Sequence, residues 1–393
     1  MMASHVPFVH TIEDCRQLRA HYLDSKVIRV SLEAAKTVAP HLPGKDSVGR
    51  WLDAGFDGYP VAVHGKKGAI PSYIRTFDPD NVMGNAELRR RPQIDVVRPV
   101  IDRALSACMK LAASWLTVPQ LPVADDGSRN QLNCTLAQAT HDWKSRREFR
   151  GLLVLPLIFT AKDQLKGRTQ WRLKLRAARR CYDEATANVV WVVDSKLDDQ
   201  EGRETFRKRF DALIRFHQDL KEELPPKTTV VAGPYWGMNL VLWARGLCDY
   251  PAVSLGSGYR YYLAGGFRRA GSTRVALPPL RRCAIADRLL RDWLAETLQH
   301  LDPEDRAFKE FNALNSRFSL LTERDTARDQ VAGFYKRWFD KIASAPAAGR
   351  ALALYQDLSS AYVLGKYLPS LPKSGRATLK PEKVAQDLML SCL

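Results

Sequence analysis

Short apolar segments rich in β-branched residues recur along the chain, and most of them are separated by segments with a helical spacing of apolar positions. Strands that are apolar along their whole length and alternate with helices are typical of a parallel sheet covered on both faces. Eight such segments predict an α/β fold, a (β/α)8 TIM-like barrel with a helical C-terminal extension. An open doubly wound sheet is the alternative, less favoured because no glycine-rich dinucleotide fingerprint follows the first segment. The eight segments are 27–32, 60–64, 115–121, 152–160, 189–194, 228–232, 251–255 and 273–277.

The same pattern predicts how the chain is divided. A barrel is expected over residues 1–301, and a helical extension with a tail over residues 302–393. An insertion at about 64–92 separates the second and third segments and is rich in glycine, proline and charged residues. It is long for a barrel connection, and long loops in compact domains are usually functional or disordered.

Basic residues outnumber acidic ones so strongly that the formal net charge is +17. Such an excess produces a positive field that concentrates polyanions, which predicts DNA or RNA as a partner. A solubility charge spread evenly over the surface is the alternative. The densest basic segment is 161–180, where arginines spaced by three and four residues share one face of a predicted helix. The residues expected to bind nucleic acid are Lys166, Arg168, Arg172, Arg176, Arg179 and Arg180.

The cysteines give no sign of a metal site or of disulfides. The seven cysteines lie far apart, without a CxxC pair or a nearby histidine at zinc spacing. We expect reduced, mostly buried thiols, no metal and no cofactor. No apolar run approaches the ~20 residues that span a bilayer, and the first residues lack the features of a signal peptide, so we expect a cytoplasmic protein.

Candidate site residues follow from the predicted barrel, because (β/α)8 enzymes have their active sites at the C-terminal ends of the strands. Asp194 ends one apolar strand and Asp249 precedes another, and we expect them to form a catalytic pair. For Asp194, capping of the following turn is the alternative. The residues expected to bind substrate are Asp163, Gln164, Gly233, Tyr235, Trp236, Gly256, Ser257, Gly258, Tyr259 and Arg260.

These substrate-binding candidates have different expected roles. Asp163 and Gln164 can hydrogen-bond to the edge of a base, with loop capping as the alternative. The glycine loop 255–260 offers backbone N–H groups and an arginine to a phosphate. Aromatic residues gather around the two glycine loops and can stack on a base, with core packing as the alternative. They are Tyr235, Trp236, Tyr259, Tyr261 and Tyr262.

Three segments within residues 115–282 share the order of elements of a known family: AQATHDWKSR, LPLIFTAKDQ and GPYWGMNLVLWARGLCDYPAVSLGSGYR. They resemble the tRNA-guanine transglycosylase superfamily, base-exchanging barrels that include relatives acting on DNA. The resemblance implies a (β/α)8 fold, a nucleic-acid partner and a carboxylate that attacks the sugar while the base leaves. Two features depart from the family: its catalytic aspartate would fall out of register near 249–251, and its zinc-binding cysteines are absent.

Three functional hypotheses follow. The first is a nucleic-acid-binding barrel that exchanges or modifies a purine-type base in DNA or RNA, which makes it a glycosyltransferase if it is an enzyme. The second is a catalytically inactive barrel that binds nucleic acid or, through its C-terminal helices, a protein partner in a larger assembly. The third is a small-molecule enzyme whose positive charge attracts a phosphorylated substrate.

Overall fold

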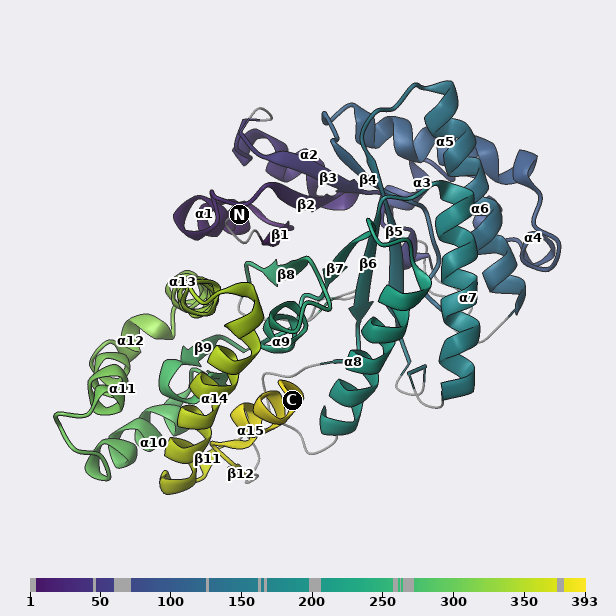
Figure 1. Cartoon of the computed structure of the whole chain (residues 1–393). Coiled ribbons are helices and arrows are strands. Elements are labelled where there is room, and N and C mark those ends of the chain that lie inside the picture. The colour runs from purple at the N-terminus through teal and green to yellow at the C-terminus, as the bar shows by residue number, and fades with distance from the viewer. Residues whose placement is uncertain are drawn as a thin grey trace.

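Eight parallel strands close into a barrel in the computed structural model of the chain, and β8 pairs with β1 to complete the circle (Figure 1). The predicted (β/α)8 barrel is confirmed. The structure describes residues 5–44, 47–59, 72–124, 127–161, 164–165, 168–197, 206–256, 261, 263, 272–372 and 378–393. The barrel strands are β1 (Val6–Val9), β2 (Val27–Ser31), β3 (Gly49–Asp53), β4 (Trp115–Thr117), β5 (Leu152–Phe159), β6 (Val189–Asp194), β7 (Thr229–Ala232) and β8 (Tyr250–Ser254).

The strands of the barrel differ from the predicted set at both ends and in the third position. The prediction misses β1, which has four residues, and β3, whose sequence GRWLD contains no run of β-branched residues. The predicted strand 60–64 lies outside the described residues. The predicted strand 273–277 corresponds to β9 (Arg274–Leu277), which pairs antiparallel with β10 (Arg282–Ile285) outside the barrel. Two prolines directly after β9 turn the chain back, so β9 forms a hairpin instead of continuing into a barrel helix.

Helices cover the outside of the barrel. In α1 the Thr11 hydroxyl accepts a hydrogen bond from the Asp14 N–H at 3.2 Å, and the Asp14 carboxylate accepts one from the Thr11 N–H at 3.0 Å. This reciprocal capping box fixes the start of the helix directly after β1. The helices are α1 (Ile12–His21), α2 (Leu32–Val38), α3 (Ser72–Arg75), α4 (Ala86–Arg90), α5 (Ile94–Met109), α6 (Gly127–Arg146), α7 (Arg168–Ala185), α8 (Phe206–Glu223) and α9 (Met238–Ala244).

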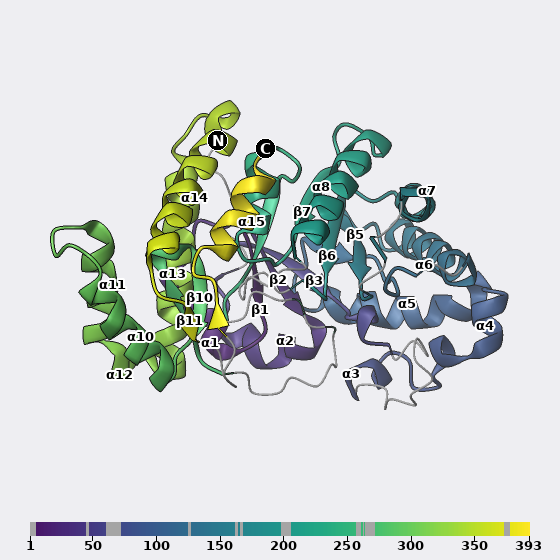
Figure 2. The same cartoon turned by 90° about the horizontal axis from the view of Figure 1, so that it is seen from below.

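A helical C-terminal part lies on one side of the barrel, next to α1, α8 and α9 (Figures 1 and 2). It has a second hydrophobic core in which β9, α10 and α11 pack together. No helix among the described residues is long and apolar enough to cross a membrane. The elements of this part are α10 (Arg288–Gln299), α11 (Arg306–Ser316), α12 (Phe318–Leu321), α13 (Arg324–Ala343), α14 (Arg350–Tyr367), β11 (Leu371–Pro372), β12 (Thr378–Leu379) and α15 (Lys383–Ser391).

Strand pairing determines which side chains face the barrel interior. Residues paired across neighbouring parallel strands point to the same face, and the register places Phe8, Arg29, Trp51 and Trp115 in one row from β1 to β4. The ring of Phe8 packs against Trp51 and, across the barrel, against Trp191 of β6, so this row faces the interior. Every second residue of each strand therefore faces inward, and the residues between them face the helices.

Candidate active site

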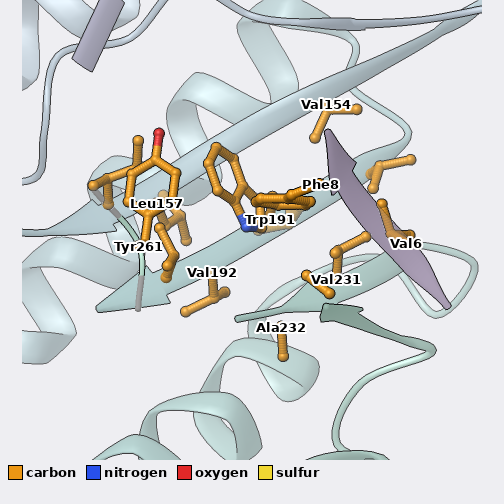
Figure 3. Close-up of a cluster of buried hydrophobic side chains, with 14 of the residues drawn as sticks. Val6, Phe8, Val154, Leu157, Trp191, Val192, Val231, Ala232 and Tyr261 are labelled. Atoms are coloured by element: carbon orange, nitrogen blue, oxygen red, sulfur yellow. The ribbon is translucent and has the colours of Figure 1, made fainter. Parts of the chain in front are cut away.

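An arginine side chain lies in the middle of the barrel interior. Arg29 is the central residue of β2, and it is only 1% exposed. Its guanidinium carbon lies 4.5 Å from the ring centroid of Phe8 and 4.6 Å from that of Trp191, with Trp51 and Tyr261 completing the aromatic enclosure. Figure 3 shows the rings of Phe8, Trp191 and Tyr261 within this buried cluster. Aromatic faces stabilise a cation, but a buried full charge also needs an ionic partner.

Asp53, the last residue of β3, is that partner. Arg29 Nη2 donates to Asp53 Oδ2, and the carboxylate is almost completely buried. The other oxygen of Asp53 accepts a hydrogen bond from the Gly55 N–H at 2.9 Å, which ends the strand in a tight turn. Gly55 has a φ of 72°, in the left-handed region that favours glycine. The Tyr73 hydroxyl donates to the Gly55 carbonyl at 2.8 Å and holds this turn in place.

A second buried carboxylate lies just beyond this turn. Asp57, in the 3-10 helix η2 (Phe56–Gly58), accepts a hydrogen bond from the Tyr261 hydroxyl at 2.8 Å. The Tyr261 oxygen in turn accepts one from Arg29 Nη2 at 3.3 Å. A continuous chain of contacts thus runs from Arg29 through Tyr261 to Asp57 at the C-terminal end of the barrel. We call these three residues together with Asp53 the mouth network.

Two groups of the mouth network, Arg29 and Tyr261, have shifted pKa values. Burial lowers the pKa of Arg29, but the nearby Asp53, with Tyr261 and Asp57, raises that pKa above its ordinary value, so the guanidinium stays charged. Burial, and then the charge of Asp57, raise the pKa of Tyr261 well above its ordinary value, so the hydroxyl keeps its proton and donates it in a hydrogen bond. Arg29 Nε and Nη1 have no hydrogen-bond acceptor among the described residues. No group of three or more His, Cys, Asp or Glu side chains in the described part of the chain is placed to hold a metal ion.

Asp194 lies at the C-terminal end of β6, as predicted, but its side chain points away from the barrel interior. It pairs with Phe159, whose ring packs against Phe216 of α8 at 5.0 Å, so this position faces the helices. Arg209 of α8 binds both oxygens of the carboxylate, each at 2.5 Å. Asp194 Oδ1 also accepts a hydrogen bond from the Lys196 N–H at 2.9 Å. This contact caps the following turn, which was the alternative to a catalytic role. Asp194 therefore joins β6 to α8 and caps a turn.

Asp249 lies at the opposite end of the barrel. Its N–H donates to the Val230 carbonyl at 2.8 Å, and its carboxylate accepts from the Val230 N–H at 2.7 Å. Val230 pairs with Val190 of β6, four residues before Asp194. Roughly 13 Å of strand therefore separates the levels of the two carboxylates. The expected catalytic pair is wrong, because a pair that shares one substrate must lie at one end of the barrel.

Two of the predicted substrate-binding residues stabilise loops. Gln164 Oε1 accepts hydrogen bonds from the Thr160 N–H at 2.6 Å and the Ala161 N–H at 3.0 Å, so it closes the loop after β5. For Gln164 the structure thus shows the alternative role, in which the side chain caps a loop instead of binding the edge of a base. The Gly233 carbonyl accepts a hydrogen bond from the indole of Trp191 at 2.8 Å and anchors that ring in the barrel interior.

The other described members of the predicted set pack between the barrel and the C-terminal part. Tyr235 and Trp236 are completely buried. The Tyr235 oxygen accepts a hydrogen bond from the Asp194 N–H at 2.8 Å, and Trp236 stacks on Phe334 of α13 at 6.0 Å. Core packing, the alternative to base stacking, accounts for both. Gly256 lies close to an arginine of α13. Residues Asp163, Ser257, Gly258, Tyr259 and Arg260 lie outside the described residues.

The arginines predicted to bind nucleic acid lie on α7 with mixed surroundings. Arg179 and Arg180 pair with acidic residues one turn further along the helix, at 2.7 Å and 4.0 Å. Arg172 and Arg176 are exposed and form no ion pair within the described part of the chain. Lys166 lies outside the described residues, as does the side chain of Arg168. This helix face carries both signs of charge, which is typical of a solvated surface.

Sequence reasoning missed Arg29, Asp53 and Asp57, and placed Tyr261 only among the stacking aromatics. Asp53 was missed because the strand that it ends, β3, was not predicted. Asp57 was missed because the turn after β3 was not predicted either. A signal for Arg29 was present, because VIRVS has a single charged residue at the centre of an otherwise apolar strand. A buried charge at such a position is rare unless it is paired.

Comparison with known proteins gives no family. No family model matches the chain, and no curated protein matches it. Among solved structures, it is similar to 2,3-dimethylmalate lyase, a PEP mutase/isocitrate lyase superfamily member (10% identity, 64% of this chain, 75% of that chain, TM-score 0.36). It is also similar to oxaloacetate acetylhydrolase in complex with oxalate (12% identity, 64% of this chain, 75% of that chain, TM-score 0.35). A third is the carboxyl transferase domain of pyruvate carboxylase from Rhizobium etli with 3-hydroxypyruvate (8% identity, 93% of this chain, 60% of that chain, TM-score 0.38).

The geometry contradicts the predicted function. None of the three similar structures is named as a base transglycosylase. The two aspartates that base exchange was expected to use lie at opposite ends of the barrel. The prediction of a nucleic-acid-binding barrel that exchanges a base, with an inactive binding module as its alternative, is therefore wrong.

Proposed function

We propose that the chain is a small-molecule enzyme that performs acid–base chemistry at the C-terminal mouth of its barrel. The mouth network carries this proposal: one buried arginine holds a carboxylate and, through a tyrosine, a second carboxylate at the end of the barrel where (β/α)8 enzymes act. Burying such groups is costly, and apolar side chains of similar volume would fill a barrel at least as stably. Perturbed ionisable groups in this position are typical of functional sites.

Asp57 is the proposed proton acceptor. The Tyr261 hydroxyl orients the carboxylate through Oδ2, and Arg29 in turn binds the Tyr261 oxygen. Arg29 and Tyr261 are thus positioning residues, and Asp53 fixes Arg29 and the turn that carries Asp57. A positioned proton acceptor of this kind contributes about 10²–10⁴-fold to a reaction rate.

The proposed substrate is a small organic anion. The net charge of +17 favours anions near the protein surface. An anion bound above the turn that follows β3 would bring its reacting hydrogen near Asp57.

The proposal is tested by thermal unfolding in the presence of a library of small carboxylates, phosphate esters and neutral sugars. A ligand at a hundredfold excess over its Kd stabilises the folded state by about 2.7 kcal/mol. We compare the wild type with Tyr261→Phe and with Tyr22→Phe, a matched control that removes a buried hydroxyl whose acceptor is the Ala332 carbonyl of α13. An anionic compound should stabilise the wild type and Tyr22→Phe, and stabilise Tyr261→Phe less. If no compound stabilises the wild type, or if Tyr261→Phe responds like Tyr22→Phe, the proposal is wrong.

A further inference from the structure

A large hollow lies in the C-terminal part, apart from the mouth network. It has a volume of about 660 Å³ and lies between α11, α12, α13 and the prolines that follow β9. None of its lining residues belongs to a barrel strand. A neighbouring hollow of about 480 Å³ shares part of its wall. Volumes of this size are typical of sites for small ligands. We call the larger hollow the basic cavity.

The charges that line the basic cavity do not balance. Arg281 and Lys341 both bind Asp357, at 2.6 Å, and Arg306 binds Glu310 at 2.7 Å. Of these two carboxylates only Glu310 lines the basic cavity, and Asp357 lines the neighbouring hollow. The second carboxylate that lines the basic cavity, Asp329 of α13, pairs with a histidine of α1.

Two further arginines line the basic cavity. Arg317 lies between α11 and α12, and Arg337 lies on α13. Both are exposed, and neither forms an ion pair with the residues that the structure describes. Five cationic side chains and two carboxylates line the basic cavity, and Asp357 of the neighbouring hollow neutralises a further positive charge, so a surplus of about two positive charges remains.

The floor of the basic cavity is apolar and aromatic. The rings of Phe334 and Trp338 are buried and stacked, with centroids 5.9 Å apart. The Arg281 guanidinium lies 5.6 Å from the Phe334 ring, and two buried leucines, Leu314 and Leu321, complete the floor. A ligand that fits this surface has an apolar or aromatic body and an anionic group that reaches the two arginines.

We propose that the basic cavity binds a phosphate monoester of an aromatic or apolar molecule. The two negative charges of such a phosphate match the cationic surplus, and arginine forks suit phosphate oxygens. Arg317 and Arg337 bind the phosphate, and the Phe334 and Trp338 rings contact the body of the ligand. The site shares no residue with the mouth network, so a failed test of one proposal does not affect the other.

The test uses 1-naphthyl phosphate as the probe and isothermal titration calorimetry as the measurement. The double variant Arg317→Gln/Arg337→Gln is compared with Arg172→Gln/Arg176→Gln, which removes two exposed arginines of α7 that also have no ion pair among the described residues. Both variants lower the net charge by the same amount and spare the buried ion pairs, so both should fold.

We expect one molecule of 1-naphthyl phosphate to bind per chain of the wild type and of the α7 variant. The cavity variant should bind it about tenfold or more weakly, because it loses both charge-assisted contacts. Inorganic phosphate and 1-naphthol should each bind more weakly than the ester. An equal loss of affinity in the two variants would show a general effect of charge. Binding of inorganic phosphate as tightly as the ester would show that the aromatic floor does not contribute to binding. Either result, or the absence of one-to-one binding by the wild type, overturns the proposal.

Discussion

Neutralising Arg29 alone, or Asp53 alone, should destabilise the protein more than neutralising both. Arg29 is 1% exposed and Asp53 is 3% exposed, so neither charge can be hydrated in the folded state. Arg29→Met leaves a buried carboxylate without its cation, and Asp53→Asn leaves a buried guanidinium without its primary partner. Each single change should cost about 3–5 kcal/mol, whereas replacement of a whole buried pair is often close to neutral. Because the double variant should lose less than either single variant, the coupling energy between the two positions should be at least as large as one single loss, about 3 kcal/mol or more, at or above the top of the usual range for residues in contact.

Equilibrium urea denaturation of the wild type, the two single variants and the double variant measures this coupling. The analysis requires equal m-values, because a changed m-value indicates a changed unfolded or folded state instead of a lost contact. The Asn side chain keeps an oxygen that can accept the Gly55 N–H, so Asp53→Asn removes the charge and retains the turn. If the losses of the two single variants add within about 0.5 kcal/mol in the double variant, the two charges do not stabilise each other and the reasoning is refuted.

Three further predictions follow. Burial lowers the pKa of His5 to about 3, so the unfolded chain binds a proton that the folded protein does not, and stability falls as the pH drops below about 6.5. In urea denaturation, His5→Phe should reduce the loss of stability between pH 7 and pH 5 by about 2 kcal/mol, and an unchanged loss would contradict the burial argument. Gly237 and Gly246 both have positive φ, but a Cβ would meet a leucine of α15 at 2.4 Å only at Gly237. Gly246→Ala should cost about 1–2 kcal/mol and Gly237→Ala about 1–3 kcal/mol more, and equal losses would argue against the clash. Arg209→Met should cost about 3–5 kcal/mol, because it leaves the fully buried Asp194 carboxylate without its cation, and a loss below 1 kcal/mol would show that water replaces the arginine.

The barrel could be predicted because its central strands have a strong local signal. β5 has eight residues and β6 has six, and all but the terminal Asp194 of β6 are apolar. β1 and β3 lack such a signal, because they are short or carry charged residues, and they become strands by pairing with β2. Their placement depends on closing the barrel, which is a tertiary constraint that a local pattern does not contain.

The candidate site could be predicted only in its general position. Asp194 does lie at the C-terminal end of a strand. Successive side chains of a strand point to opposite faces, so an error of one residue in the predicted register exchanges the barrel interior for the side that faces the helices. The true interior residue Arg29 has its partner Tyr261 232 residues away in the chain, and that contact exists only after folding. Composition and periodicity predict neither the strand register nor contacts between residues so far apart in the chain.

The central claim is that the proton acceptor is Asp57 at the mouth of the barrel. The most direct measurement is kcat of Asp57→Asn and of Asp249→Asn on the compound that the ligand screen identifies, at saturating concentration. Asp249 is a matched control, since its carboxylate accepts a backbone hydrogen bond at the opposite end of the barrel. The account predicts that Asp57→Asn lowers kcat about 10²-fold or more while Asp249→Asn stays within about twofold of the wild type. Wild-type turnover by Asp57→Asn, or an equal loss in both variants, would contradict the account.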